Sequence, residues 1–378
     1  MIPFNKAIYL EKSAQYVKEA LQSSMIAGDG KFTKLSSELM EKKFNAKKVL
    51  LTTSCTAALE MTALLLDIKE GDEVIMPSYT FVSTANAFVI HGGIPVFVDI
   101  RKDTMNIDET LIEAAITEKT KAIVVVHYAG VGCDMDKICA IGKKYNIPIV
   151  EDAAQGVNAT YKGKYLGTIG DLGCYSFHET KNYTMGEGGA LVINNENYIE
   201  RAEILREKGT NRARFYRGQI DKYSWVDKGS SYLPSEMNVA YLYGQLECMD
   251  MINDNRTETW NTYNNSFMEL HERGIIELPV IPDECIHNAH MYYVKLNNIE
   301  ERTEFIKFLK LNEISGVFHY VPLHSSEAGQ RFGRMNGNDV HTTEESNKLV
   351  RLPMYYGITE IEKQHIIKSV KKFIYDKK

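Results

Sequence analysis

The length and charge of the chain bound the kinds of protein it can be. It has 378 residues, with 44 Lys and Arg against 50 Asp and Glu, and a net charge of −6. At about 150 residues per domain, this length predicts two domains or one large one, with a substantial core. The negative charge and the lack of a dense basic block argue against nucleic acid as the main partner.

The sequence contains no pattern typical of a membrane or secreted protein. Its longest apolar stretch, residues 57–68, is interrupted by Glu60 and Asp67, whereas a membrane helix needs roughly 18 uninterrupted apolar residues. The N-terminal segment MIPFNKAIYLEKS lacks an apolar run of signal-peptide length. Six cysteines form no Cys-x-x-Cys pair, which fits neither a disulfide framework nor a zinc ribbon. We therefore expect a cytoplasmic protein with reduced cysteines and no membrane partner.

Residues 47–194 alternate short apolar runs with helical patterns. The runs lack strict polar alternation, which is typical of strands covered on both faces. The helical patterns begin after the capping residues Ser54, Ser78, Asn106 and Asp134. This alternation predicts a mostly parallel α/β sheet. The expected strands are 47–53, 72–77, 94–100, 121–128, 147–153, 172–178 and 189–194, and the expected helices are 56–66, 80–91, 108–117 and 135–145.

The second half of the chain is organised differently. A helical pattern over 198–208 precedes an irregular, aromatic-rich stretch over 209–234, and loops of that length are usually functional. We divide the chain into a large domain, 1–250, and a small α+β domain, 251–378. The remaining expected elements are a long helix over 235–270, strands over 290–296 and 317–323, and helices over 302–312 and 361–375.

Polar and aromatic residues follow the first two expected strands. Ligands of an open parallel sheet bind beyond the carboxyl ends of its strands, where helix N-termini direct N–H groups at anions. Ser54, Cys55 and Thr56 open a helix there, which suits a phosphate but also fits a plain helix cap. Tyr79 and Phe81 follow the second strand. Their rings either stack on a planar ligand or are half-buried parts of the core.

Acidic residues and a lysine follow later strands. Glu151 and Asp152 end the fifth strand. The sequence allows two interpretations, a buried carboxylate with a cationic partner or an acid that caps a helix. Lys181 lies just beyond the sixth, where a desolvated amine with a lowered pKa suits Schiff-base chemistry, although most lysines are simply exposed. All these residues fall at one edge of one sheet. The set fits pyridoxal 5′-phosphate, with a lysine for its aldehyde, an acid for its pyridinium nitrogen, an aromatic for its ring and hydroxyl groups for its phosphate.

The ordered motifs of the chain resemble those of the DegT-type nucleotide-sugar aminotransferases. The resemblance covers essentially the whole chain and implies fold type I of the pyridoxal-phosphate enzymes, the aspartate aminotransferase-like α/β fold. Segments such as LLTTSCTAALEM and GCYSFHETKNYT are similar, within the family, to the enzymes that make dTDP-4-amino-4,6-dideoxygalactose. The motifs that carry the family resemblance are TSCTAALEM, PSYTFVSTANA, VEDAAQG, SFHETKN followed by GEGGAL, and HYVPLH.

The resemblance implies roles for individual residues. Lys181 matches the Schiff-base lysine, Asp152 the acid paired with the pyridinium nitrogen, and Gln155 the residue near the phenolic oxygen of the cofactor. Phe81 matches the aromatic that stacks on the ring. The other cofactor contacts it implies are Ser54, Cys55, Thr56 and Ser176, with Ser231 reaching the neighbouring subunit's phosphate, and the expected substrate contacts are Tyr79, Arg212, Tyr232, His319, Tyr320 and His324.

The sequence departs from the family pattern at two places. Most relatives have Gly or Ala at the position of Cys55. The backbone N–H of any of these residues can contact the phosphate. Most also have Asn-Tyr-Arg where this chain has Ser231-Tyr232-Leu233, which puts the role of Ser231 in question. Arg212, Arg214 and Arg217 in the long loop suit a nucleotide diphosphate or a solvated basic surface.

The resemblance also implies a reaction and an assembly. It predicts transfer of the amino group of L-glutamate to dTDP-4-keto-6-deoxy-D-glucose, giving dTDP-4-amino-4,6-dideoxy-D-galactose for surface polysaccharide. It further predicts a homodimer with active sites at the subunit interface. A gluco-configured product, a 3-amino sugar and a non-catalytic regulator stay open as alternatives. No metal is expected, because the histidines at 287, 290, 319 and 324 lack a third ligand at zinc-like spacing.

Overall fold

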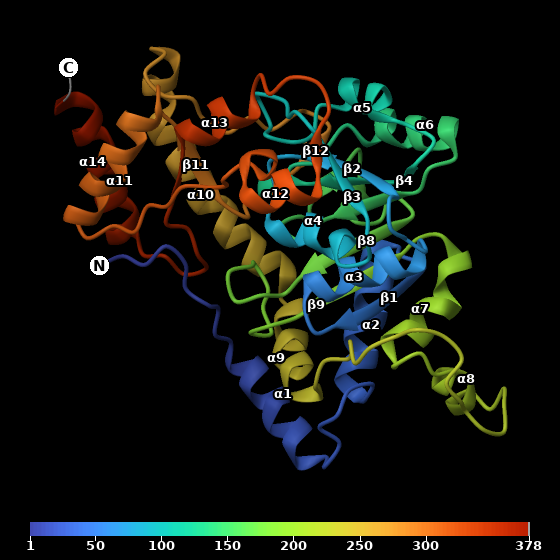
Figure 1. The fold of residues 1–378 in the computed structure, drawn as a ribbon. Helices are drawn as coiled ribbons and strands as arrows, with labels where there is room; N and C mark the ends of the chain where they lie inside the picture. Colours follow the sequence, from blue (N-terminus) through green and yellow to red (C-terminus); the bar gives the residue numbers. More distant parts are fainter. Residues whose placement is uncertain (377–378) are drawn as a thin grey trace.

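A single eight-stranded sheet forms the centre of the molecule in the computed structural model, which describes residues 1–376 (Figure 1). Its strand order is β1-β9-β8-β5-β4-β2-β3-β12, and β9 runs antiparallel to both of its neighbours, β1 and β8. All other strand pairs of this sheet are parallel. The strands are β1 (Lys48–Thr52), β2 (Glu73–Pro77), β3 (Ile94–Val98), β4 (Thr120–Val126), β5 (Ile149–Asp152), β8 (Leu172–Ser176), β9 (Gly189–Ile193) and β12 (Arg334–Met335).

Helices cover both faces of the sheet, so that successive strand residues enter different cores. In β1, Val49 and Leu51 belong to one core and Leu50 to the other, as the alternation of side chains along a strand requires. This layering confirms the predicted α/β class. One face carries α3 (Cys55–Leu65), α4 (Val82–Val89) and α7 (Ile199–Arg206), and the other carries α2 (Lys31–Phe44), α5 (Glu109–Ala115), α6 (Met135–Tyr145) and α9 (Glu236–Leu246).

A separate core lies at the C-terminal end of the chain. It joins residues between Trp260 and Ile374 with Ile2 from the N-terminus. The division at residue 250 stays a prediction. The elements around this core are α10 (Met249–Glu272), β11 (Tyr292–Lys295), α11 (Ile299–Leu311), α13 (Thr342–Lys348), β13 (Leu349–Leu352) and α14 (Glu360–Asp376).

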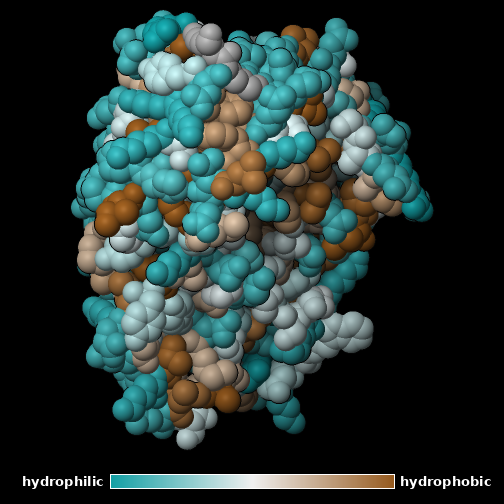
Figure 2. Space-filling model, turned by 90° about the vertical axis from the view of Figure 1, so that its left-hand side faces the viewer, coloured by the Kyte–Doolittle hydropathy of each residue, from teal (hydrophilic) through white to brown (hydrophobic). Residues whose placement is uncertain are grey.

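Several shorter elements complete the described fold. The arm over residues 209–231, which contains α8, extends away from the sheet (Figure 1). The face in Figure 2 is mostly hydrophilic, with hydrophobic side chains in small groups. Within residues 1–376, no helix has the length and apolar composition needed to cross a bilayer. The shorter elements are α1 (Glu11–Gln22), β6 (Thr160–Tyr161), β7 (Lys164–Tyr165), α8 (Arg212–Tyr216), β10 (Cys285–Ile286) and α12 (Glu327–Phe332).

Two predicted elements are wrong. Residues 317–323 form no strand, because the carbonyl of His319 accepts from the Tyr79 hydroxyl and the N–H of Leu323 bonds to the carbonyl of Ser78. These backbone groups are therefore unavailable to a sheet. The expected helix over 235–270 is two helices, since the chain leaves helical geometry at Cys248, where φ is −114° and ψ is 19°.

A buried carboxylate joins α2 to α9. Glu236 is 1% exposed and accepts hydrogen bonds from the N–H groups of Gly30 (3.0 Å), Phe32 (2.7 Å) and Thr33 (3.0 Å). These N–H groups belong to the first turn of α2 and the residue before it, which have no partner within the helix. Glu236 thus caps α2 from a residue about 200 positions away in the sequence.

We expect Glu236→Ala to lower the free energy of unfolding by about 2–4 kcal/mol, because it leaves buried N–H donors without acceptors. Urea unfolding followed by circular dichroism measures the change. Glu38→Ala, on the exposed side of the same helix, is the matched control. Equal midpoints for both variants would show that the cap contributes nothing.

Candidate functional site

The residues at the strand ends meet at one edge of the sheet. Asp152 ends β5 and Ser176 ends β8, its parallel neighbour. Ser176 pairs with Gly189 of β9, and Gly189 pairs with Thr52 at the end of β1. The register therefore aligns the exits of these strands, as the sequence predicts.

Close packing brings the start of α3 against this edge. A side chain at position 189 would place its Cβ 2.4 Å from the backbone nitrogen of Cys55, so only glycine allows this approach. Ser54 caps the helix by accepting the N–H of Ala57 at 3.0 Å. Thr56 Oγ1 donates to Ser83 Oγ at 2.8 Å. The first-turn N–H groups, including that of Cys55, have no partner within the helix and point toward the strand ends, as an anion requires.

Asp152 is a buried carboxylate held from two sides. Its Oδ2 accepts from Thr84 Oγ1 at 2.7 Å, and its Oδ1 accepts from the N–H of Ala154 at 3.1 Å. Burial raises the pKa of Asp152, while the hydrogen bonds and the nearby Lys181 act in the opposite direction. A cationic nitrogen placed against this carboxylate would keep it ionised.

Glu151, the residue before Asp152, has a different task. Its carboxylate accepts N–H groups from Gly167, Ile169 and Gly170 and lies 2.8 Å from Nε2 of buried His127. All of these partners are protein groups. Glu151 therefore fastens the 167–170 loop to the sheet, and Asp152 is the acid that faces the site.

Lys181 lies in a turn beyond β8 that is fixed on both sides. Its N–H bonds to the carbonyl of His178 at 2.9 Å. The next residue, Asn182, donates to the carbonyl of Asn288 at 2.7 Å and contacts Nδ1 of His290 at 3.1 Å. Burial lowers the pKa of Lys181, and Cys55 and Asp152 oppose this effect. Among residues 1–376, no group forms a hydrogen bond or ion pair with its amine, which is thus free to react.

Aromatic side chains form the wall beside these groups. Phe81 is 55% exposed, and its ring centroid lies 6.1 Å from that of Tyr320. Gln155 donates to the Tyr320 hydroxyl at 3.2 Å and accepts the N–H of Ala129 at 2.7 Å, which fixes its amide. His319 is buried and contacts the Tyr128 hydroxyl through Nδ1 at 3.1 Å. We refer to Tyr79, Tyr128, Tyr293 and Tyr320 as the tyrosine cluster.

Two expected substrate contacts bond within the protein. His324 contacts Ser78 Oγ through Nδ1 at 2.6 Å and Asp339 through Nε2 at 3.1 Å. The carbonyl of Tyr232 accepts the N–H of Thr53 at 2.9 Å, so this backbone lies beside the start of α3. Both residues fix neighbouring segments, and their contact with substrate stays a prediction.

The arginines of the arm are paired within this chain. Arg212 stacks on Tyr216, with 5.0 Å between the guanidinium carbon and the ring centroid. Arg214 forms an ion pair with Glu200 at 3.1 Å, and Arg217 with Glu203 at 2.8 Å. Ser231 is exposed on the same arm, where it pairs with Glu207. The contact of these arm residues with cofactor or substrate stays a prediction.

Sequence reasoning missed three residues that the structure brings to the site. Thr84 holds Asp152, Tyr128 holds His319, and Arg351 on β13 acts electrostatically on Lys181. Thr84 and Tyr128 carry no sequence signal that separates them from core residues. Arg351 does carry a sequence signal, because it is the one charged residue within the otherwise apolar run LVRLPM.

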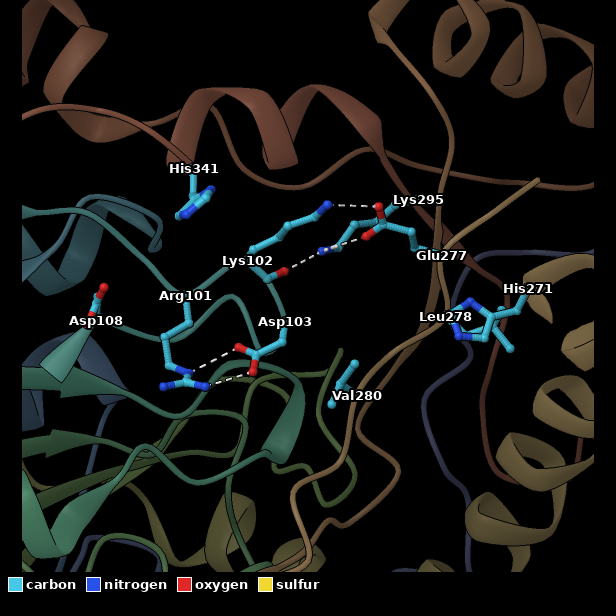
Figure 3. Close-up of a pocket in the computed structure, with 10 residues that line it drawn as sticks. All are labelled: Arg101, Lys102, Asp103, Asp108, His271, Glu277, Leu278, Val280, Lys295 and His341. Carbon is cyan, nitrogen blue, oxygen red and sulfur yellow. Dashed lines mark hydrogen bonds and ion pairs between the residues drawn. The ribbon is translucent and has the colours of Figure 1, made fainter. Parts of the chain in front are cut away.

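A cavity of about 460 Å³ lies elsewhere, between the loop after β3 and the C-terminal elements (Figure 3). Its lining includes Arg101, Lys102 and Lys295, which are all paired with acids. Arg101 binds Asp103 at 2.8 Å, Lys102 binds Glu277 at 3.2 Å, and Lys295 binds Glu345 at 2.7 Å. This cavity offers no unpaired Lys or Arg to an anionic ligand, unlike the edge of the sheet.

Comparison with known proteins agrees with this geometry. Residues 8–371 match the DegT/DnrJ/EryC1/StrS aminotransferase family. The chain belongs to this family. It is 36% identical to the uncharacterized protein MJ1066 of Methanocaldococcus jannaschii, over 98% of this chain and 97% of that one. It is 30% identical to the spore coat polysaccharide biosynthesis protein SpsC of Bacillus subtilis, over 99% and 97% of the two chains.

Solved structures of other aminotransferases have the same fold. The aminotransferase TlmJ of Streptoalloteichus hindustanus superposes with a TM-score of 0.91 at 25% identity, covering 100% of this chain and 99% of that chain. Helicobacter pylori PseC, an aminotransferase involved in the biosynthesis of pseudoaminic acid, gives 0.89 at 25% identity with 99% of both chains covered. The protein therefore has the fold type I architecture, and its cofactor is pyridoxal 5′-phosphate.

The residues at the strand ends fit this cofactor. A lysine amine without a hydrogen-bond partner suits its aldehyde, and a buried carboxylate whose pKa is raised suits a cationic ring nitrogen. The free N–H groups at the start of α3 suit its phosphate. Phe81 leaves an exposed ring face for stacking. We propose that the residues that would hold it are Ser54, Cys55, Thr56, Phe81, Asp152, Gln155, Ser176 and Lys181.

We expect Gly189→Ala to weaken cofactor binding at least about tenfold, because the new Cβ displaces the backbone of Cys55 from the phosphate position. Absorbance titration of the apoenzyme with pyridoxal 5′-phosphate measures the affinity. Gly156→Ala is the control, since its Cβ meets only side chains, at 3.1 Å or more. Unchanged affinity in Gly189→Ala would place the phosphate elsewhere.

Proposed function

We propose that this protein transfers the amino group of L-glutamate to dTDP-4-keto-6-deoxy-D-glucose and releases dTDP-4-amino-4,6-dideoxy-D-galactose. The observation that carries the proposal is the convergence of Lys181, Asp152 and the start of α3 at one edge of the sheet. The amino-acid sequences of the motifs are similar to those of the enzymes that make this sugar, which supports the choice of substrate. The relatives PseC and SpsC, whose names refer to pseudoaminic acid and to spore coat polysaccharide, support a role in sugar biosynthesis.

Each residue of the site has a distinct task in this proposal. Pyridoxal 5′-phosphate, when bound, supplies an electron sink for the carbon next to the transferred nitrogen. Lys181 binds its aldehyde, and the amine freed by the amino donor moves a proton at the reacting carbon. The lowered pKa of Lys181 favours the unprotonated amine that this proton transfer needs. Asp152 keeps a proton on the ring nitrogen.

The arm over residues 209–231 completes the proposal. It exposes the aromatic residues Tyr216 (68%), Tyr223 (51%) and Trp225 (80%). Exposed aromatic groups of this kind are typical of surfaces that another protein covers. We propose that a second copy of the chain covers the arm, in a homodimer with shared sites, and that Ser231 then reaches the partner's cofactor phosphate.

We expect Lys181→Ala to reduce turnover at least about 1,000-fold, because both the covalent attachment and the proton transfer are lost. Borohydride reduction of the wild-type holoenzyme, followed by peptide mass analysis, should find the cofactor on the peptide that contains Lys181. Lys121→Ala, an exposed lysine on β4, is the control and should keep full activity. Turnover in Lys181→Ala would contradict the assignment of this residue.

The configuration of the product tests the choice of sugar. The enzyme, L-glutamate and dTDP-4-keto-6-deoxy-D-glucose should yield a 4-amino sugar whose amine is axial in the product NMR spectrum. An equatorial amine would identify the gluco-configured product instead. No reaction with this sugar, but reaction with a 3-keto isomer, would assign the enzyme to the 3-amino sugars.

A further inference from the structure

A histidine just before β11 is joined to the turn that carries Lys181. His290 has 9% of its surface exposed, and its Nδ1 contacts Oδ1 of Asn182 at 3.1 Å. Asn182 is itself buried and follows Lys181 directly in the sequence. The ring of His290 is therefore bonded to the neighbour of the lysine.

The hydrogen bonds of Asn182 determine which nitrogen of His290 carries the proton. The carbonyl of Asn288 accepts a hydrogen bond from Asn182 at 2.7 Å, so the amide nitrogen of Asn182 faces this carbonyl. The other atom, Oδ1, is an acceptor, and Nδ1 of His290 must donate to it. A neutral histidine has a single N–H, which leaves Nε2 with a free lone pair. Within the described residues, Nε2 of His290 forms no hydrogen bond.

The surroundings of His290 keep it neutral. Burial lowers its pKa well below the usual value, and the charges of Lys181, Arg256 and Arg351 lower it further. His319, which lies near it, is also neutral, because burial lowers its pKa well below the usual value too. Nε2 of His290 is thus a hydrogen-bond acceptor that does not take up a proton.

A buried arginine fixes the backbone of His290. Arg256 on α10 is 3% exposed and donates to the carbonyl of Ala289 at 3.0 Å and to that of His290 at 2.7 Å. Ala289 has a φ of 48°, in the left-handed region that residues other than glycine rarely adopt. Backbone of this kind persists only where neighbouring contacts hold it. The position of the His290 ring is therefore determined on both sides, by Arg256 and by Asn182.

The amine of Lys181 is a close neighbour of this ring. The charge of Lys181 affects the pKa of His290 at least as strongly as that of Arg256, although Arg256 bonds to the carbonyl of His290 itself. Both cations are buried, so their relative effects reflect distance. The long lysine side chain has the freedom to turn its amine toward Nε2.

We propose that Nε2 of His290 accepts a hydrogen bond from the amine of Lys181 whenever that amine is not bonded to the cofactor, and so fixes the direction of its lone pair. This inference rests on the proposed aminotransferase function. The amine takes a proton from the reacting carbon, keeps one N–H on Nε2 while it is an ammonium group, and gives the proton to the next atom. His290 has the same charge before and after, so it is a positioning residue for Lys181.

Two substitutions separate this role from simple support of the turn. In His290→Asn, the side-chain amide can still donate to Asn182, but no atom replaces Nε2. In His290→Gln, the longer side chain can place its amide oxygen at the position of Nε2, but the bond to Asn182 is lost. Positioning of the amine therefore requires that the glutamine variant is the more active of the two, whereas support of the turn requires the opposite order.

The experiment measures exchange of the α-proton of L-glutamate in heavy water by proton NMR, on the holoenzyme at saturating glutamate. His290→Asn should slow the exchange about 10- to 100-fold, because the amine loses its acceptor, and His290→Gln should slow it less. His287→Asn is the matched control on the same segment. Nδ1 of His287 accepts the N–H of Ala289 at 3.2 Å, which the asparagine oxygen can also accept, so its exchange rate should equal that of the wild type.

Nitrogen NMR of isotope-labelled histidine tests the hydrogen bond without turnover. In the amine form of the holoenzyme, Lys181→Ala should shift the Nε2 signal of His290 and leave its Nδ1 signal in place. The loss of both signals in His290→Asn identifies them. An unchanged Nε2 signal in Lys181→Ala, or slower exchange in His290→Gln than in His290→Asn, would overturn the inference alone. A wild-type protein that exchanges the α-proton of no amino acid would instead overturn the proposed function, and the inference with it.

Discussion

The site depends on an acid and an amine that are buried together without forming an ion pair. Burial raises the pKa of Asp152 and lowers that of Lys181, so each group favours its neutral form, and each also stabilises the charge of the other. Direct contact would satisfy both, yet no ion pair joins them in the described residues. Separate anchors hold them apart, Thr84 for the carboxylate and Asn182 for the lysine turn. A planar cofactor with a cationic nitrogen at one end and an aldehyde at the other supplies both missing partners.

This separation is a property of the sheet. Asp152 ends β5 opposite Cys174, two residues before β8 ends at Ser176, and Gly189 lets the start of α3 approach the same edge. A side chain at position 189 would instead displace the backbone of Cys55 from this edge. The positions of the acid, the lysine turn and the anion-binding helix therefore follow from backbone register more than from contacts among the side chains.

Backbone register is also what the sequence predicts best. Apolar runs and capping residues such as Ser54 and Asp134 locate the strands and helices of the central sheet to within about two residues, because each strand is covered on both faces. Prediction is weaker where the backbone bonds to distant residues. The sequence predicts a strand at His319 and Leu323, but their backbone groups form hydrogen bonds with Tyr79 and Ser78 instead. Arg351 stands in an apolar strand like many surface charges, and only the face it shares with Tyr293 places it by the site.

The two halves of the chain contribute different parts of this chemistry. In our proposal, the central sheet supplies the groups that hold the cofactor, and these serve both substrates. Arg351 comes from β13 in the C-terminal half, and its charge lowers the pKa of Lys181 in addition to burial. The N-terminal segment contacts both halves through adjacent residues, since Phe4 packs against Arg351 and Asn5 donates to the carbonyl of Glu179 in the Lys181 turn. The turn that carries Lys181 is therefore held by the N-terminal segment through Asn5 and by the C-terminal half through the contact of Asn182 with Asn288.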